Sequence, residues 1–364
     1  MRFKSIATGA TFAASLILAT LPVKAQELPE GYPADYSDLI AKAKKEGRVS
    51  LYAATDEEQA TALLTAFTQK YGIQVDYTDM GTNNAYSRTI AEAEANQTGG
   101  DIIWSSAMDL QLKLAVDGYT ETYESPEIKN LPEWANYKNM VYATTVEPVG
   151  TIYNTNSFPD DSFPKTRAAL IAYIQNHRKE LSNKIATFDP EKSGVGFVIQ
   201  TNDGRSSESF WQLAKAMGEA KVKSYSATGT MRETVVSGEN VMAVNVIGSY
   251  ALNWIKNTPN LGVAFGTDYT AAFSRPAIIP RGAPHPHAAR LFLDFMLSKD
   301  GQTAIAEKGL PSIRTDIEGY LDLDSLNDMV GGNLQPIALD DALLEYLKPQ
   351  NRVKFFREWN AAVK

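Results

Sequence analysis

The chain contains no cysteine, and only three of its 364 residues are histidine. Without thiols it has no disulfide, no cysteine nucleophile and no cysteine ligand for a metal ion. A chain of this length buries enough apolar surface to fold without disulfides, so the absence of cysteine is compatible with export from the cell. It also leaves no cysteine for a lipid anchor, and we expect a freely diffusing protein.

The sequence also lacks the short motifs of common enzyme classes. It has no G-x-S-x-G nucleophile elbow, no H-E-x-x-H zinc motif, no P-loop and no G-x-G-x-x-G dinucleotide fingerprint. His285 and His287 stand one residue apart around a proline, and we interpret them as surface residues rather than metal ligands. We therefore predict a protein that is not an enzyme and has no cofactor and no bound metal. An exported hydrolase is the alternative.

The one extended apolar run lies close to the N-terminus. Arg2 and Lys4 precede it, apolar and small residues over 5–22 form it, and Val23-Lys24-Ala25 follows it. The run is short for a transmembrane helix, which needs about 20 apolar residues. This layout is typical of a secretory signal peptide with an A-x-A-like cleavage site. We predict a signal peptide over residues 1–25, cleavage after Ala25 and a periplasmic mature protein.

Positive charge is in deficit, with 35 Lys and Arg against 43 Asp and Glu, for a formal net charge of −8. Removal of Arg2, Lys4 and Lys24 with the signal peptide changes this to −11, because residues 1–25 contain no acid. A net acidic protein is soluble and poorly suited to the phosphate backbone of nucleic acids. We therefore expect no nucleic-acid partner. The net charge does not predict the charge of a small ligand, because a ligand responds only to the local field of its site.

Beyond residue 48, short apolar runs alternate with amphipathic helical segments, which indicates βαβ units. We expect strands over 49–54, 73–77, 101–104, 142–146, 151–153, 184–188, 241–247, 261–265 and 277–280. Helices are expected over 57–71, 83–96, 107–116, 167–179, 207–217, 231–237 and 287–308. The predicted fold class is α/β, in two lobes that each hold a mixed sheet covered by helices on both faces.

Two segments are candidates for the crossings between these lobes. Glu147-Pro148-Val149-Gly150 follows the strand-like run at 142–146, and residues 266–273 form the return. We assign 26–147 and 270–364 to the first lobe and 148–269 to the second. Open α/β sheets bind ligands at the carboxyl ends of their strands, so two such edges that face each other across a hinge form a closing trap.

Four segments, in this order and spacing, resemble one family. They are Leu51-Tyr52-Ala53-Ala54-Thr55-Asp56, Gly100-Asp101-Ile102-Ile103-Trp104-Ser105-Ser106, Val236-Ser237-Gly238-Glu239-Asn240-Val241-Met242-Ala243 and the stretch from Ala288 to Gln302. The chain resembles the type II periplasmic solute-binding proteins of ABC importers, in the cluster of ferric-iron-binding-like proteins. The resemblance spans almost the whole mature chain. It implies a two-lobed fold, an inner-membrane ABC permease as partner, and a monomer that closes on a small solute.

The residues that such proteins use for ferric iron are mostly missing. The position after the first strand holds Thr55 and Asp56 instead of a histidine, and the loop after Trp104 holds Ser105 and Ser106 instead of a glutamate. The region of the paired tyrosines has one tyrosine, Tyr250. Since Fe(III) prefers anionic oxygen ligands, ferric binding with a synergistic anion is the alternative rather than the main hypothesis.

The residues found instead are hydroxyls and glycines at strand ends, many of them just before a predicted helix. Helix N-termini with hydroxyl donors bind oxyanions, although Ser and Thr are also ordinary helix caps. Asp56 and Glu147 would require a ligand that carries hydrogen-bond donors, unless Glu147 fixes the hinge. Arg275 either binds the oxyanion or forms an interlobe salt bridge. We predict a sugar phosphate or phosphonate as ligand, bound by Thr55, Asp56, Ser105, Ser106, Thr145, Glu147, Gly194, Gly196, Thr228, Thr230, Gly248, Ser249, Tyr250 and Arg275.

Overall fold

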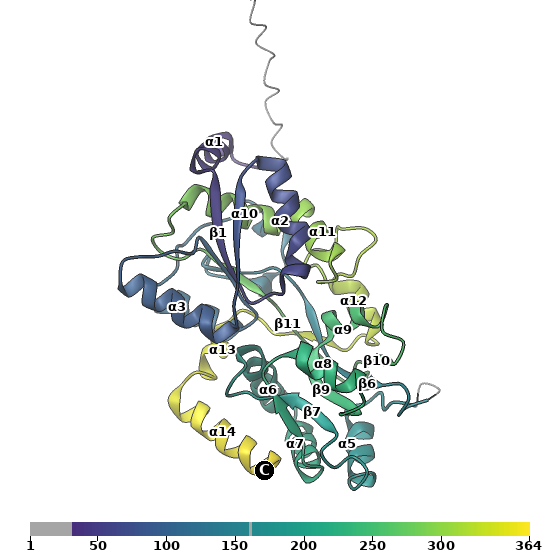
Figure 1. Ribbon diagram of the computed structural model, residues 1–364. Helices are drawn as coiled ribbons and strands as arrows, with labels where there is room; N and C mark the ends of the chain where they lie inside the picture. The colour runs from purple at the N-terminus through teal and green to yellow at the C-terminus, as the bar shows by residue number, and fades with distance from the viewer. Residues whose placement is uncertain (1–30, 160–161) are drawn as a thin grey trace, which may run out of the picture.

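The computed structural model describes residues 31–159 and 162–364, which fold into two α/β lobes, one above the other in Figure 1. The predicted signal peptide over 1–25 lies outside the described residues. Within the described part of the chain, no helix is long and apolar enough to cross a membrane.

The first lobe is built on a six-stranded mixed sheet. Its strand order is β2 (Gln74–Asp79), β1 (Arg48–Ala53), β3 (Ile102–Trp104), β12 (Pro276–Ile278), β5 (Val141–Ala143) and β4 (Asn136–Tyr137). The strands β2, β1 and β3 are parallel, whereas β12 runs antiparallel to both of its neighbours. Its helices are α1 (Tyr36–Glu46), α2 (Glu57–Tyr71), α3 (Thr82–Glu94), α4 (Met108–Val116), α10 (Pro286–Leu297) and α11 (Lys299–Glu307), with short 3-10 turns at Ile128–Asn130 and Glu133–Ala135.

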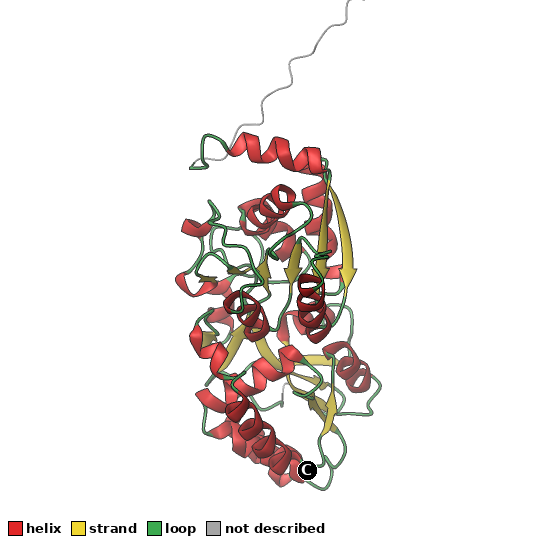
Figure 2. Cartoon of the chain, turned by 90° about the vertical axis from the view of Figure 1, so that its left-hand side faces the viewer, coloured by secondary structure: helices red, strands yellow, loops and turns green. Residues whose placement is uncertain are grey.

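The second lobe contains a seven-stranded mixed sheet. Its order is β13 (Leu334–Pro336), β11 (Thr270–Phe273), β6 (Glu147–Asn154), β9 (Met242–Ile247), β7 (Ile185–Phe188) and β8 (Lys223–Tyr225), with β10 (Leu261–Ala264) also paired to β6. Its helices are α5 (Arg167–Asn176), α6 (Gly194–Ser206), α7 (Ser209–Glu219), α8 (Thr228–Val236) and α9 (Gly248–Trp254). Figure 2 shows helices flanking the strands in both lobes, which confirms the predicted fold class.

Sheet membership corrects the predicted lobe boundary at residue 270. The strand β11 pairs with β6, and β13 pairs with β11, so both belong to the second sheet. The return crossing therefore lies between Phe273 and Pro276. The reason is that 270–273 is a short, wholly buried run whose sequence carries no signal for one sheet over the other.

The C-terminal segment bridges the two lobes instead of belonging to the first. After α12 (Leu323–Met329) and β13, the helix α13 (Asp341–Glu345) packs against α4 of the first lobe. The Tyr137 hydroxyl of that lobe donates to an Asp341 carboxylate oxygen at 2.6 Å. The last helix, α14 (Pro349–Val363), then packs along α7 of the second lobe, as its yellow ribbon in Figure 1 shows.

The helix predicted over 287–308 is two helices that meet at Ser298. This residue has extended backbone angles of φ −69° and ψ 163°, and its hydroxyl accepts a hydrogen bond from Gly301 N–H at 3.2 Å. Such a cap starts a new helix. The predicted packing of this segment on the first lobe is confirmed, because α10 contacts α1 and α11 contacts α2.

Candidate functional site

A cavity of about 570 Å³ lies between the lobes. The first lobe contributes the carboxyl ends of β1 and β2 and the start of α3, and the second lobe contributes the starts of α6, α8 and α9. In open α/β folds, ligands bind at such sheet edges, where helices begin. The polar residues that line the cavity are Asp56, Asp79, Thr82, Asn83, Asn84, Ser106, Lys192, Ser193, Ser226, Thr228, Thr230, Glu233, Tyr250 and Arg275.

The wall formed by the second lobe presents the start of α8. The N-cap residue of this helix is Ala227, which has no side-chain oxygen to cap the first N–H groups. Thr228, which is 4% exposed, has a buried hydroxyl without a hydrogen-bond partner in the described structure. Unsatisfied N–H groups and the positive end of the helix dipole favour an anion at this position. The nearby Ser193 hydroxyl already accepts a hydrogen bond from Gly196 N–H at 3.1 Å and so serves as an ordinary cap of α6.

The wall formed by the first lobe is acidic. Asp56 is the N-cap residue of α2, but its carboxylate accepts no capping hydrogen bond. Asp79 ends β2, the strand next to β1, and burial together with the charges of Asp56 and Glu57 raises its pKa. Among the described residues, neither Asp56 nor Asp79 has an ion-pair partner. A ligand group with hydrogen-bond donors, such as a hydroxyl or an ammonium, would therefore be stabilised here.

A buried polar cluster lies at the crossings, behind the cavity. The Arg275 guanidinium donates to both Glu147 carboxylate oxygens, at 2.7 Å through Nε and 3.2 Å through Nη2. The same carboxylate accepts hydrogen bonds from Thr145 at 2.9 Å and from Ser249 at 2.5 Å. Arg275 Nη1 also donates to the Thr55 hydroxyl at 3.0 Å. These hydrogen bonds occupy the Glu147 carboxylate. Of its two predicted roles, ligand binding and fixing the hinge, they favour the second.

Tyr250 joins this cluster to the cavity. Its ring centroid lies 5.0 Å from the Arg275 guanidinium carbon, and its hydroxyl accepts a hydrogen bond from Asp56 N–H at 3.4 Å. This contact connects the second lobe to the first. Burial raises the pKa of Tyr250 to about 12. Within residues 31–159 and 162–364, no group of three or more His, Cys, Asp or Glu side chains is placed to hold a metal ion.

The predicted site residues fall into three sets. Six of them line the cavity: Asp56, Ser106, Thr228, Thr230, Tyr250 and Arg275. Four others, Thr55, Thr145, Glu147 and Ser249, form the buried cluster with Arg275, which belongs to both sets. The remaining four have local packing roles: Ser105 accepts from Ala107 N–H, Gly196 packs on Phe188, Gly248 packs on Phe265, and Gly194 contacts the first lobe. Contact of any of them with a ligand stays a prediction.

Sequence reasoning missed the loop from Asp79 to Asn84. It lines the cavity because β2 is parallel to β1, so the two strands end at the same edge. The rule that selected Thr55 and Asp56 after β1 applies equally to Asp79 after β2. Glu233 and Lys192 were also missed, and their side chains carry no motif that distinguishes them from ordinary helix and loop charges.

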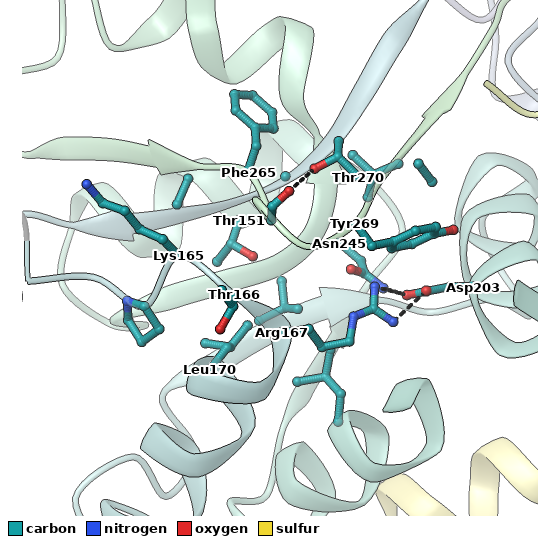
Figure 3. Close-up of a pocket in the computed structure, with 18 of the residues that line it drawn as sticks. Thr151, Lys165, Thr166, Arg167, Leu170, Asp203, Asn245, Phe265, Tyr269 and Thr270 are labelled. Carbon is teal, nitrogen blue, oxygen red and sulfur yellow. Dashed lines mark hydrogen bonds and ion pairs between the residues drawn. The ribbon is translucent and has the colours of Figure 1, made fainter. Parts of the chain in front are cut away.

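A second, much smaller cavity of about 60 Å³ lies inside the second lobe (Figure 3). The Arg167 guanidinium donates to both Asp203 carboxylate oxygens, at 2.6 and 2.9 Å, and Asn245 donates to the same carboxylate at 3.2 Å. Asn245 has a left-handed φ of 58°, which an asparagine adopts more readily than most residues. A cavity this small has room for a few water molecules and not for an organic solute.

Comparison with known proteins agrees with this geometry. The family described as bacterial extracellular solute-binding protein matches residues 62–320. A substrate binding protein of an ABC transporter from Agrobacterium tumefaciens is 35% identical and has a TM-score of 0.82, over 87% of this chain and 94% of that one.

Two further solved structures share the fold at lower identity. The periplasmic binding protein AfuA from Actinobacillus pleuropneumoniae, with fructose-6-phosphate bound, has a TM-score of 0.69 at 20% identity, over 87% of this chain and 98% of that one. Iron-bound HitA from Pseudomonas aeruginosa has a TM-score of 0.66 at 19% identity, over 86% of this chain and 99% of that one. The family match covers most of the chain, so this protein belongs to the bacterial extracellular solute-binding proteins, the substrate-binding components of ABC transporters.

Proposed function

We propose that the protein captures a small anionic organic solute, of the sugar phosphate or phosphonate type, in the cavity between its lobes. The observation that carries this proposal is the buried, unpartnered Thr228 hydroxyl at the uncapped start of α8. A phosphate or phosphonate oxygen at that point would accept hydrogen bonds from the Thr228 hydroxyl and from the first N–H groups of the helix. Without a ligand, the Thr228 hydroxyl has no partner in the described structure.

The acidic wall opposite indicates what the other end of the solute carries. Asp56 and Asp79 face the cavity without a cation, and the two cations that line it already have partners. Arg275 is paired with Glu147, and Lys192 lies 3.1 Å from Asp189. A purely anionic solute would be repelled by this wall, so the bound molecule needs hydroxyl or amine donors beside its anionic head.

The similar structures support this chemistry without assigning it. AfuA holds fructose-6-phosphate, a solute with an anionic head and several hydroxyls. HitA holds iron, and the ferric alternative would here rest on one cavity tyrosine, Tyr250, since no group of three or more His, Cys, Asp or Glu side chains among the described residues is placed to hold a metal ion. The residues of this cavity therefore favour the organic solute over ferric iron.

The test is a thermal unfolding panel on the mature protein. Fructose 6-phosphate and 2-aminoethylphosphonate represent the two solute types, and fructose, inorganic phosphate and ferric citrate are the controls. A ligand present at 100 times its Kd stabilises the folded state by about 2.7 kcal/mol, which raises the midpoint by several degrees. A rise with a phospho-compound and none with fructose supports the proposal. A flat response to phosphates and phosphonates, or a rise with ferric citrate alone, overturns it.

Variants of the acidic wall separate the two solute types. Asp79→Asn should weaken binding of the aminophosphonate more than that of the sugar phosphate, because only the former loses a charge–charge interaction. Equal losses would indicate that the wall accepts hydrogen bonds from hydroxyls.

Several properties follow for the mature protein as part of the same proposal. We infer export with cleavage after Ala25, free diffusion in the periplasm as a monomer, delivery to an inner-membrane permease, and no catalytic activity. Mass spectrometry and size-exclusion chromatography of the periplasmic fraction test the cleavage site and the monomeric state. A mass that includes residues 1–25 would contradict the predicted processing.

A further inference from the structure

A third cavity lies between the lobes, on the other side of their direct contact. Gly194 N–H of the second lobe donates to the Thr82 hydroxyl of the first at 3.0 Å, and this contact separates the solute cavity from a neighbouring cavity of about 330 Å³. The neighbouring cavity is lined by α3 and α4 from the first lobe, by α6 from the second lobe, and by the C-terminal segment. It shares Asn83 with the solute cavity.

The feature that distinguishes this cavity is Asp109, in the first turn of α4. Its side chain is 1% exposed, and its Oδ2 has no hydrogen-bond partner among the described residues. Oδ1 accepts only the N–H of the adjacent Leu110, at 2.8 Å. Burying an ionised carboxylate with so few partners is costly, and burial accordingly raises the pKa of Asp109 to about 7.

The cavity beside Asp109 is lined by α3 and α4 of its own lobe, by residues of the second lobe and by residues of the C-terminal segment. From the second lobe, α6 and the loop before it present Gly194, Phe197 and Pro190, none of which carries a charge. The C-terminal segment that bridges the lobes presents Leu347 and Arg352, and the positive charge of Arg352 opposes the rise in the pKa of Asp109.

The remaining titratable neighbours do not neutralise Asp109. On its own helix, Lys113 forms an ion pair with Asp117. Tyr86 of α3 and Tyr346 of the bridging segment both have raised pKa values, first because of burial and further because of the Asp109 charge. Arg352 lies over the rings of Phe197 and Phe356, at 4.7 and 5.1 Å, and forms no ion pair in the described structure. Asp109 therefore has no charge partner in hydrogen-bonding contact.

We propose that closure of the lobes buries Asp109 and takes up a proton on its carboxylate, so that the closed form is favoured at low pH. When the lobes separate, α6 leaves α4 and water reaches the carboxylate through the cavity. In water an aspartate has a pKa of about 3.9. The closed form thus binds more protons than the open form between about pH 4 and pH 7, and its population falls as the pH rises through that window.

The test measures the separation of the lobes without any ligand, so it does not depend on the identity of the solute. Because the chain has no cysteine, Thr65→Cys and Ser237→Cys introduce one label site on each lobe, both at exposed positions. Pulsed electron paramagnetic resonance then gives the ratio of closed to open molecules at pH 5, 6, 7 and 8. One titrating proton changes this ratio at most tenfold per pH unit, and we expect a change approaching this slope between pH 5 and pH 7.

Three variants in the same labelled background decide the proposal. Asp109→Asn should abolish the pH response, and Arg352→Met should move it to higher pH, because the cation that opposes protonation is gone. Asp294→Asn should keep the wild-type response, since Asp294 is an equally buried carboxylate that lies away from the lobe contact. A wild-type ratio that is constant from pH 5 to pH 8, or an unchanged response in Asp109→Asn, overturns the proposal. The second outcome would show that the titrating group is not Asp109.

Discussion

The Glu147 carboxylate and the Arg275 guanidinium form a wholly buried ion pair at the two crossings between the lobes, with side chains that are 0% and 1% exposed. Each residue lies where one of the crossings joins a sheet, and Thr145 and Ser249 donate to the carboxylate. A buried pair is seldom a large net gain in stability, because both charges lose their hydration. Its position at the crossings instead ties the two connecting segments to each other.

Removing one partner of this pair should be costly. Glu147→Gln leaves the Arg275 cation buried without its counter-charge, and we expect a loss of about 3–5 kcal/mol in the free energy of unfolding. The double variant Glu147→Gln with Arg275→Met should recover part of this loss, because no charge then remains unpaired. Urea denaturation followed by circular dichroism measures both values.

The matched control is Glu239→Gln. Glu239 pairs with Lys223 at 2.8 Å, but their side chains are 55% and 33% exposed. An exposed pair contributes under about 1 kcal/mol. If Glu147→Gln were no more destabilising than Glu239→Gln, the hinge cluster would not have the structural role that we assign to it.

Gly194 sets how closely the lobes approach. A Cβ atom on this residue would come within 2.7 Å of the Thr82 hydroxyl and 2.9 Å of the Ala107 Cβ, both in the first lobe. Gly194→Ala should therefore keep the lobes further apart, which the paired spin labels would record as a longer distance, and ligand affinity should fall. Gly229→Ala, also in a helix that lines the solute cavity, is the control, since its Cβ would meet nothing within 4 Å. Equal distances between the labels in the two variants would contradict the role of Gly194 in setting the separation of the lobes.

The elements that sequence reasoning located well are those with strong local patterns. The run over 49–54 became β1, and the helical spacing over 57–71 coincides with α2, because apolar periodicity reports burial directly. The break at Ser298 and the placement of β11 in the second sheet were missed. Both depend on packing against residues distant in the chain, which a local pattern does not contain.

For the site, residue types were easier to predict than their partners. Hydroxyls and carboxylates at strand ends did collect between the lobes, as the rule for parallel strands requires. Whether such a residue faces the cavity or a neighbouring side chain depends on contacts such as that between Glu147 and Arg275, which are 128 positions apart. Gly248 illustrates the difficulty, because the Phe265 ring packs in the space beside it.

Stability should depend on pH through Asp294. This carboxylate, 1% exposed, accepts hydrogen bonds from Tyr36 and Tyr123 at 2.7 Å and from Ser125 at 2.6 Å, and burial raises its pKa to about 7. The unfolded chain has the ordinary value of about 3.9. The folded state therefore holds the proton more tightly, so the contribution of this group to stability is fully present below about pH 4 and is lost as the pH rises through 7.

Comparison with Asp294→Asn isolates this effect. The difference in unfolding free energy between wild type and variant should move against the wild type as the pH is raised from 4 to 7.5, measured by urea titration at each pH. Asp109 contributes equally to both proteins and cancels in the difference. A difference that is constant with pH would mean that Asp294 keeps the same protonation state in the folded and unfolded chain.

Thr228→Val separates ligand binding from stability. The substitution removes a buried hydroxyl that has no partner in the described structure, so the ligand-free protein should be as stable as wild type or slightly more stable. A hydrogen bond to a charged phosphate oxygen contributes about 1.5–3 kcal/mol, so the Kd for the phospho-compound that binds in the panel should rise roughly 10- to 100-fold.

Thr201→Val is the matched control with the opposite expectation. The Thr201 hydroxyl donates to Phe197 C=O at 2.6 Å, and Thr201 does not line the solute cavity. It should lose about 1 kcal/mol of stability and keep its affinity. Calorimetric titration measures the Kd and thermal unfolding measures the stability of both variants. An unchanged Kd in Thr228→Val would show that the anion does not bind at the start of α8.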